Sequence, residues 1–197
     1  MRTGLPVPLL GAQCLLCRIR NGAPLHDPSD KGIPMVDSNT SVEKVSVEHV
    51  TIRSNNTFAA VKANLEALLP RLDDGFWTLL RYGLVDRARQ ELEAAAPLSI
   101  FGSRDHGVLL AIAGLKRQAI QYDIGNPLTA SLMTRHNLSA GLYAPIRVLL
   151  LESPEGKAVF EYDRPASTFG QFGDKGVDFV ARKLDENLAD ALERAAN

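Results

Sequence analysis

The feature that most constrains the fold is a pair of apolar segments, residues 145–152 and 157–163, connected by a short turn from Ser153 to Gly156. A turn that contains proline and glycine between two apolar runs is typical of an antiparallel β-hairpin. The apolar face of such a hairpin is stable only when a second layer of secondary structure covers it. We therefore expect helices from other parts of the chain to pack on this sheet.

The other segments supply these elements. Residues 45–53 alternate like a strand with a change of phase at His49, and apolar runs at 98–101, 108–113 and 118–124 predict a meander of three further strands. Apolar residues recur at helical spacing in four segments: 58–72, 74–96, 127–136 and 175–195. The prediction is an α+β fold, an antiparallel sheet of about five to six strands with helices on one face. The predicted order is β-α-(α)-β-β-β-α-β-β-α.

The helical segment 74–96 has two features of interest. Gly83 weakens its middle and divides it in two, while charged residues such as Arg87 and Arg89 lie mostly off its apolar stripe. Phe76 and Trp77 are expected to pack this segment onto the core, and an exposed Trp77 would indicate a surface for a ligand or partner.

A second aromatic pair follows the hairpin. Phe169 and Phe172 lie in a glycine-rich segment that ends at Gly173, and we expect both rings to be exposed. They would form either a lid over a pocket or a dimer contact.

Composition limits the function classes. The 22 basic residues nearly balance the 23 acidic ones, and no basic block is present, so the chain is not expected to bind nucleic acid. The longest apolar runs, such as residues 148–151, are far shorter than the roughly 20 residues of a membrane span. Cys14 and Cys17 form a CxxC without a second pair, which predicts neither a disulfide scaffold nor a metal or cofactor site. We expect a soluble cytoplasmic protein without membrane contact.

Two regions differ in composition. Residues 1–44 hold five of the 11 prolines and no sustained apolar period, which predicts a disordered tail. Met35 lies within this tail as an alternative start to Met1. Residues 45–197 are expected to form a single domain that carries the helical insert at 74–96.

Polar residues around the predicted strand 118–124 suggest a site. His106 is a candidate general acid or base, since its ordinary pKa lies near neutral pH, and Asp123 or Tyr122 would share proton transfer with it. Gly125 and Asn126 begin a helix at Pro127, and the free N–H groups of that helix suit a carboxylate or phosphate. The expected polar corner combines six side chains: Asp105, His106, Tyr122, Asp123, Asn126 and Arg147.

Arg147 raises a separate question because it interrupts an apolar strand. If Glu152 pairs with Lys157, then Arg147 lies opposite Tyr162, and Tyr162 joins the candidate ligand-binding residues. A buried guanidinium without a partner would cost several kcal/mol. Arg147 therefore either faces water or pairs with an acid, and we expect Asp123 or Asp105 as its partner, either in a structural ion pair or as part of a substrate site.

The same residues resemble a known family. The run from Asp123 to Pro127, the strand at 144–149, the segment 160–165 and the upstream segment 100–106 resemble the DUF302 domain. The resemblance extends from about Val45 to Leu192 and departs from the family in the helical insert and the long tail. It implies a compact α+β domain of the TBP-like kind, often dimeric, with no assigned activity.

Three functions are compatible with these residues. The first is a homodimeric protein that binds a small organic molecule, an anion included. The second is an enzyme of the isomerase, lyase or hydrolase type that acts on small metabolites through His106 with Asp123 or Tyr122. The third is a structural or interaction protein without a ligand. No GxSxG, HExxH, P-loop or dinucleotide motif is present, so nucleotide-dependent chemistry is not expected.

Overall fold

The computed structural model describes residues 39–197. Within it, the segment Glu43–Asn197 is one compact unit. The predictions for Cys14, Cys17, Met35 and most of the N-terminal tail lie outside the described residues.

Within residues 39–197, five strands form one antiparallel sheet in the spatial order β1-β5-β4-β3-β2. The hairpin predicted from the two apolar segments is present and supplies β4, the central strand, which pairs with β3, and β5, which lies between β4 and β1. The α+β fold with a single antiparallel sheet is confirmed. The strands are β1 (His49–Thr57), β2 (Ser99–Asp105), β3 (Ala119–Gly125), β4 (Ile146–Glu152) and β5 (Lys157–Asp163).

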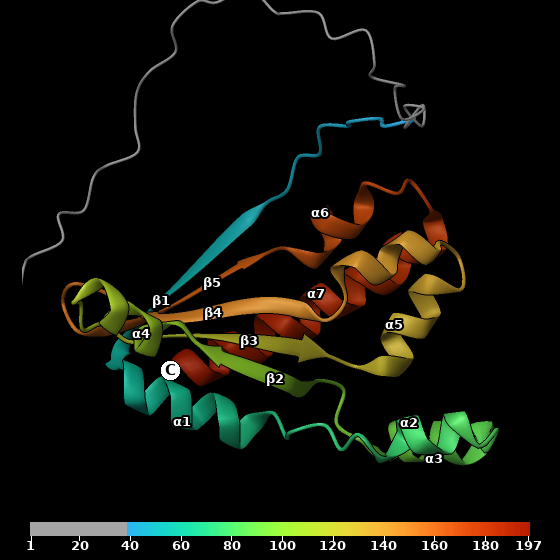
Figure 1. Ribbon diagram of the computed structural model, residues 1–197, viewed down its shortest axis with the longest axis horizontal. Coiled ribbons are helices and arrows are strands. Elements are labelled where there is room, and N and C mark those ends of the chain that lie inside the picture. The colour runs from blue at the N-terminus through green and yellow to red at the C-terminus, as the bar shows by residue number, and fades with distance from the viewer. Residues whose placement is uncertain (1–38) are drawn as a thin grey trace, which may run out of the picture. The chain divides into compact units, whose positions relative to one another are not determined.

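Two long helices cover one face of this sheet, which we call the inner face. They are α1 (Phe58–Leu68) and α7 (Lys175–Ala196), and Figure 1 shows the strands in front of α7. The apolar residues of α7 recur every three or four positions, and Leu188 and Leu192 are fully buried. The helix begins where the Asp174 carboxylate accepts hydrogen bonds from the backbone N–H groups of Gly176 and Val177.

The register of the hairpin differs from the prediction by one residue. Glu152 lies opposite Ala158, and Tyr162 lies opposite Val148. The cause is the turn, in which the Ser153 backbone N–H donates to the Lys157 carbonyl at 2.7 Å. A slip of one residue exchanges the two faces of a strand. Tyr162 is therefore on the buried inner face, and Arg147 is on the opposite face.

The predicted strand at 108–113 is wrong. This segment forms a short helix, α4 (His106–Leu109), and a 3-10 turn, η1 (Leu110–Ala113), while β2 continues to Asp105 through the predicted turn. The Asp105 carboxylate accepts a hydrogen bond from the Val108 backbone N–H at 3.0 Å and so starts a helix there. A continuous apolar run does not distinguish a strand from a helix by its periodicity.

The helical segment 74–96 divides in two, as Gly83 predicts. It forms α2 (Gly75–Arg81) and α3 (Val85–Ala94), and Gly83 adopts a φ of 74°, a conformation that favours glycine. The helix after Gly125 is α5 (Pro127–Thr134), which is followed by the 3-10 helix η2 (Leu138–Tyr143).

The expectation that Phe169 and Phe172 are exposed is wrong. The predicted glycine-rich segment overlaps a short helix, α6 (Pro165–Gly170), which begins at a proline. Phe169 belongs to this helix. Phe169 is fully buried and meets the Tyr143 ring edge-on at 6.3 Å, and Phe172 is partly buried against the core. Neither ring is therefore free to act as a lid.

The buried side chains form two separate clusters. The main core lies between the inner face of the sheet, α1 and α7. A small second cluster holds Phe76, Ala88 and Leu92 of the α2–α3 hairpin, and Leu128 of α5 packs against it. The α2–α3 hairpin thus has its own small core and reaches the rest of the domain through α5.

Candidate functional site

A pocket of about 590 Å³ lies where the two clusters meet. Its walls include Phe76, Ala88 and Leu92 from the small cluster, and residues such as Met133 and Phe169 from the main core. Pockets that hold small molecules fall in this range of volume and are mostly apolar with a few polar groups. The pocket exists because the α2–α3 hairpin packs against α5 without merging with the main core.

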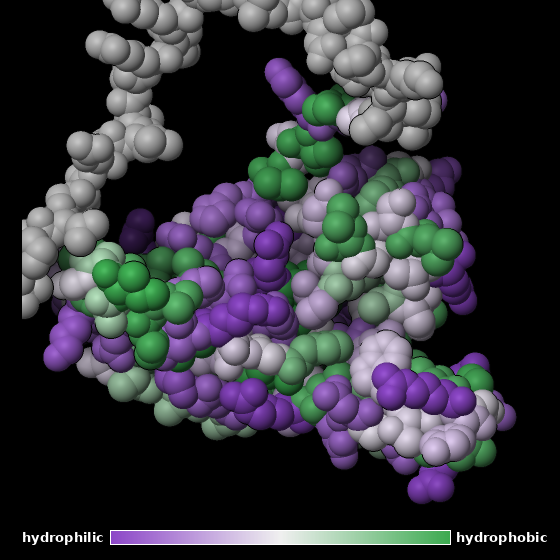
Figure 2. Space-filling model, viewed as in Figure 1, coloured by the Kyte–Doolittle hydropathy of each residue, from purple (hydrophilic) through white to green (hydrophobic). Residues whose placement is uncertain are grey.

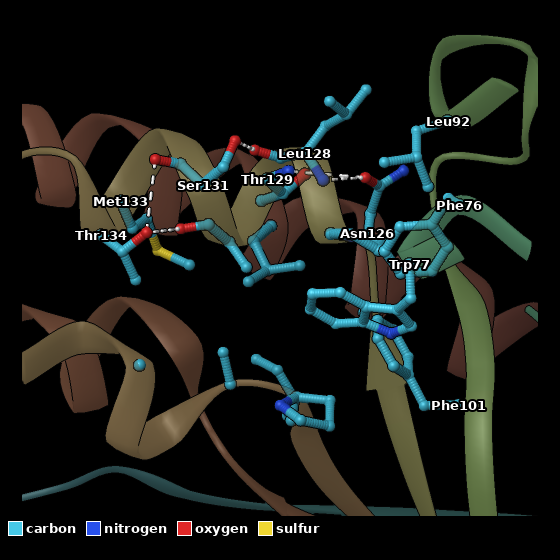
Figure 3. Close-up of a pocket in the computed structure, with 18 of the residues that line it drawn as sticks. Phe76, Trp77, Leu92, Phe101, Asn126, Leu128, Thr129, Ser131, Met133 and Thr134 are labelled. Carbon is cyan, nitrogen blue, oxygen red and sulfur yellow. Dashed lines mark hydrogen bonds between the residues drawn. The ribbon is translucent and has the colours of Figure 1, made fainter. Parts of the chain in front are cut away.

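Two aromatic side chains from α2 form one side of the pocket. The Phe76 and Trp77 ring centroids are 4.7 Å apart, and Phe101 from β2 lies next to Trp77 in Figure 3. Phe76 is buried, whereas Trp77 is 49% exposed. An exposed Trp77 was expected to indicate a surface for a ligand or partner. Trp77 is indeed partly exposed, and it lines the pocket.

The facing wall is α5, seen along the upper part of Figure 3. Asn126 fixes where this helix begins, because its side-chain oxygen accepts hydrogen bonds from the Leu128 and Thr129 backbone N–H groups at 2.8 and 3.4 Å. Its amide nitrogen donates to the Ala96 carbonyl at 3.2 Å and so ties α5 to the chain just after α3. Asn126 thus acts as the predicted N-cap and also positions the pocket wall.

The hydroxyl groups of Ser131 and Thr134 are engaged by the helix itself. Ser131 donates to the Leu128 carbonyl at 2.7 Å, and Thr134 donates to the Ala130 carbonyl at 3.0 Å. A hydroxyl that donates to its own helix has no proton left for a ligand. This wall consequently presents a largely apolar surface to the cavity.

The polar corner expected from the sequence does not form. Tyr122 and Asp123 are neighbours on β3, so their side chains point to opposite faces of the sheet. His106 and Asp105 lie where β2 ends, next to the start of β3, whereas Asn126 follows the other end of β3. Of the six residues, only Asn126 lines the apolar pocket, together with the predicted Gly125.

Tyr122 is part of the inner core rather than an accessible acid or base. Its hydroxyl donates to the Glu66 carboxylate at 3.1 Å, and the same carboxylate accepts from Lys62 at 2.7 Å. Burial, and then the charge of Glu66, raises the pKa of Tyr122 far above its usual value. The hydrogen bonds from Lys62 and Tyr122 lower the pKa of Glu66. The phenol therefore stays protonated and serves as a donor to the α1 carboxylate.

Asp105 and His106 do not form a dyad. The Asp105 carboxylate caps α4, and His106 begins that helix with an exposed side chain. Among residues 39–197, the His106 ring has no hydrogen-bond partner. A catalytic role for His106 stays a prediction, but the side chains proposed to assist it are engaged elsewhere.

Arg147 lies on the open outer face of the sheet, where Figure 2 shows hydrophilic side chains over the strands. It is exposed, so the expectation of a buried guanidinium is wrong, and the one-residue register shift explains why. Asp123 is directly across from Arg147, as its predicted partner should be. However, the Asp123 carboxylate binds Arg104 at 2.7 Å instead, and no ion pair involves Arg147 within the described part of the chain.

The same outer face carries other charges. His49 lies opposite Asp163, and the two side chains approach to 3.0 Å. Tyr162, predicted as a ligand-binding residue, is on the inner face instead. Burial, followed by the negative charge of Asp185, raises the pKa of the Tyr162 hydroxyl.

A second, more polar hollow lies at the α4 end of the sheet. Asp105, Lys116, Arg117 and Glu152 contribute to its lining. Beside it, apolar side chains of α4, η1 and the following turn face outward, and Ile112 is 89% exposed. This exposed apolar surface consists of Val108, Leu109, Ile112 and Leu115.

Sequence reasoning missed several residues of the apolar pocket. Phe101 was assigned only to a strand, and Leu80 and Arg89 only to the faces of a helix. A signal for Arg89 is its spacing, since Val85, Ala88, Arg89 and Leu92 all line the pocket and recur at intervals of three and four residues along α3. The sequence does not show which other element this face of α3 meets.

Two kinds of feature are absent from the described residues. No group of three or more His, Cys, Asp or Glu side chains in residues 39–197 is arranged to hold a metal ion. No helix in that part of the chain combines the length and the apolar character that crossing a membrane requires.

Comparison with known proteins identifies one family. The model of the family described as "Domain of unknown function DUF302" matches residues 83–195. The crystal structure of an uncharacterized conserved DUF302 protein from Bacillus stearothermophilus is 17% identical with a TM-score of 0.55, over 75% of this chain and 97% of that chain. No protein of curated function matches the sequence. The structural likeness supports the fold, and the family match includes α3 and α5 but begins after α2.

Proposed function

The chain belongs to the DUF302 family, whose name assigns no activity, and from the geometry of its apolar pocket we propose that it binds a small, largely apolar organic molecule. The observation that carries this proposal is a cavity of about 590 Å³ whose apolar walls come from α2, α3, α5 and the ends of the central strands. A half-exposed tryptophan at such a cavity offers the kind of aromatic surface that ligands use.

Binding is favoured over acid–base catalysis at this pocket. Among residues 39–197, its lining contains no Asp, Glu, His or Cys side chain, and its one charged residue is Arg89. General acid–base catalysis needs a titratable group within hydrogen-bond reach of the reacting atoms. The enzyme that uses His106 with Asp123 or Tyr122 therefore has less support, because these three side chains lie apart and none lines the pocket.

The homodimer is a separate proposal. Its candidate contact is the exposed apolar surface of Val108, Leu109, Ile112 and Leu115, which a second copy would cover with the same four residues across a two-fold axis. Asp105 and Glu152 lie beside Lys116 and Arg117 at this surface, so acidic and basic groups are both present to pair between copies. Sedimentation analysis tests this, and a monomer at every concentration would contradict it.

Trp77 provides the assay for the proposed site because it is the single tryptophan of the chain. Titration of the full chain with octanol, a neutral probe, should shift the Trp77 emission to shorter wavelength in a saturable way. The physical reason is that an apolar probe in the pocket removes water from the indole ring, which is now 49% exposed. Emission that does not change, or that changes in proportion to octanol without saturation, would contradict the proposal.

A further inference from the structure

Resting on the proposed binding function, we infer that the pocket selects an amphipathic carboxylate, with its apolar body between α2, α3 and α5 and its carboxylate at the guanidinium of Arg89. Two properties of the pocket indicate this class of ligand. They are the polar side chains that have no hydrogen-bond partner within residues 39–197, and the positive sign of the charge at the pocket.

Half of the polar side chains that line the pocket already make hydrogen bonds within the domain. Asn126, Ser131 and Thr134 make their hydrogen bonds to the backbone of the domain. Three lining side chains have no side-chain hydrogen bond in the described residues: the Thr129 hydroxyl, the Trp77 indole N–H and the Arg89 guanidinium. The last two are donors only, while a hydroxyl both donates and accepts. The pocket therefore favours a ligand that carries hydrogen-bond acceptors.

The charge at the pocket is positive and comes from Arg89. Within the described part of the chain, Arg89 is the only charged residue that lines the cavity, and no carboxylate lies there to neutralise it. Arg87, two positions earlier on α3, is different, because its Nε lies 3.5 Å from Oε1 of Glu91 on the same helix. Arg89 has no such ion pair within residues 39–197. An anion at the pocket could therefore bind Arg89 without breaking an existing ion pair of that arginine.

The geometry of the guanidinium and of the cavity specifies the anion further. A guanidinium offers two parallel N–H groups that match the two oxygens of a carboxylate, and one positive charge balances one carboxylate. Arg89 is exposed, so the charged head of the ligand would stay at the mouth of the pocket near water. The apolar side chains of Phe76, Trp77 and Leu92 would enclose the rest of the ligand.

The test compares octanoate with octanol in three proteins: the unchanged chain, Arg89→Gln and Arg87→Gln. Binding is followed by Trp77 emission. Arg89→Gln should weaken octanoate binding about threefold to tenfold, as expected for one charge-assisted contact near the surface, and leave octanol binding unchanged. Arg87→Gln, the matched control on the same helix, should change neither affinity. Added salt should weaken octanoate binding to the unchanged chain more than to Arg89→Gln.

The outcomes separate the two proposals. If octanol and octanoate both bind and Arg89→Gln affects them equally, the carboxylate inference is overturned while the apolar binding site stands. If the affinity for octanoate falls equally in both arginine variants, general surface charge explains the effect, and Arg89 does not contact the carboxylate. If neither probe binds the unchanged chain, the proposed function fails and the inference fails with it.

Discussion

Replacement of Ala130 by phenylalanine should abolish saturable binding of octanol, with a loss of affinity of roughly tenfold or more. Ala130 is half-buried on α5 and lines the pocket, so a ring at this position would occupy the volume that the probe needs. The measurement is the Trp77 emission titration, together with circular dichroism and the Tm to show that the variant is folded.

The matched control is Ala63→Phe. Ala63 is an exposed alanine inside another helix, α1, and it lines neither of the two cavities. This variant should bind octanol like the unchanged chain. A folded Ala130→Phe protein that still binds octanol with unchanged affinity would show that the probe occupies a different place.

The second large effect concerns stability. Leu188→Ala should lower the free energy of unfolding by about 2–5 kcal/mol, because it removes a buried side chain and leaves a cavity that the core fills only in part. Leu188 is fully buried in α7, which packs against the sheet and α1. Urea denaturation followed by circular dichroism measures the loss.

Leu138→Ala is the control for this substitution, since Leu138 in η2 is 85% exposed. Its free energy of unfolding should remain within about 0.5 kcal/mol of that of the unchanged chain, as is usual for surface positions. Equal losses at Leu138 and Leu188 would contradict the assignment of α7 to the stabilising core.

Local signals in the sequence predicted much of this fold. The β4–β5 hairpin, the break at Gly83 between α2 and α3, the Asn126 cap of α5 and the long α7 all depend on residues close together in the chain. Turn chemistry, caps and apolar periodicity are sufficient for such elements. The overall class, helices on one face of an antiparallel sheet, follows from their order.

The predictions of the hairpin register and of a strand at 108–113 were wrong because single hydrogen bonds determine the conformation of these segments. The turn bond at Ser153 shifted the hairpin register by one residue and so moved Arg147 from the expected core to the exposed face. The cap by Asp105 turned an apolar run into α4 and η1. Both effects depend on single hydrogen bonds that apolar periodicity does not reveal.

The candidate site was the least predictable part. Sequence reasoning collected polar residues that are near one another along the chain, such as Tyr122 and Asp123, although alternation places them on opposite faces. The pocket instead joins segments far apart, from Phe76 in α2 to Phe169 in α6. The sequence places Arg89 off the apolar stripe of its helix, and the packing of α3 beside α5 is what brings Arg89 to the cavity.

The most direct test of the central claim is a two-dimensional amide NMR titration of the full chain with octanol. The account predicts saturable shift changes concentrated in two segments, residues 75–94 and 125–134, which contain α2, α3 and α5. Changes concentrated instead at residues 105–118, around the second hollow, or no saturable changes at all, would contradict the claim that the apolar pocket is the binding site.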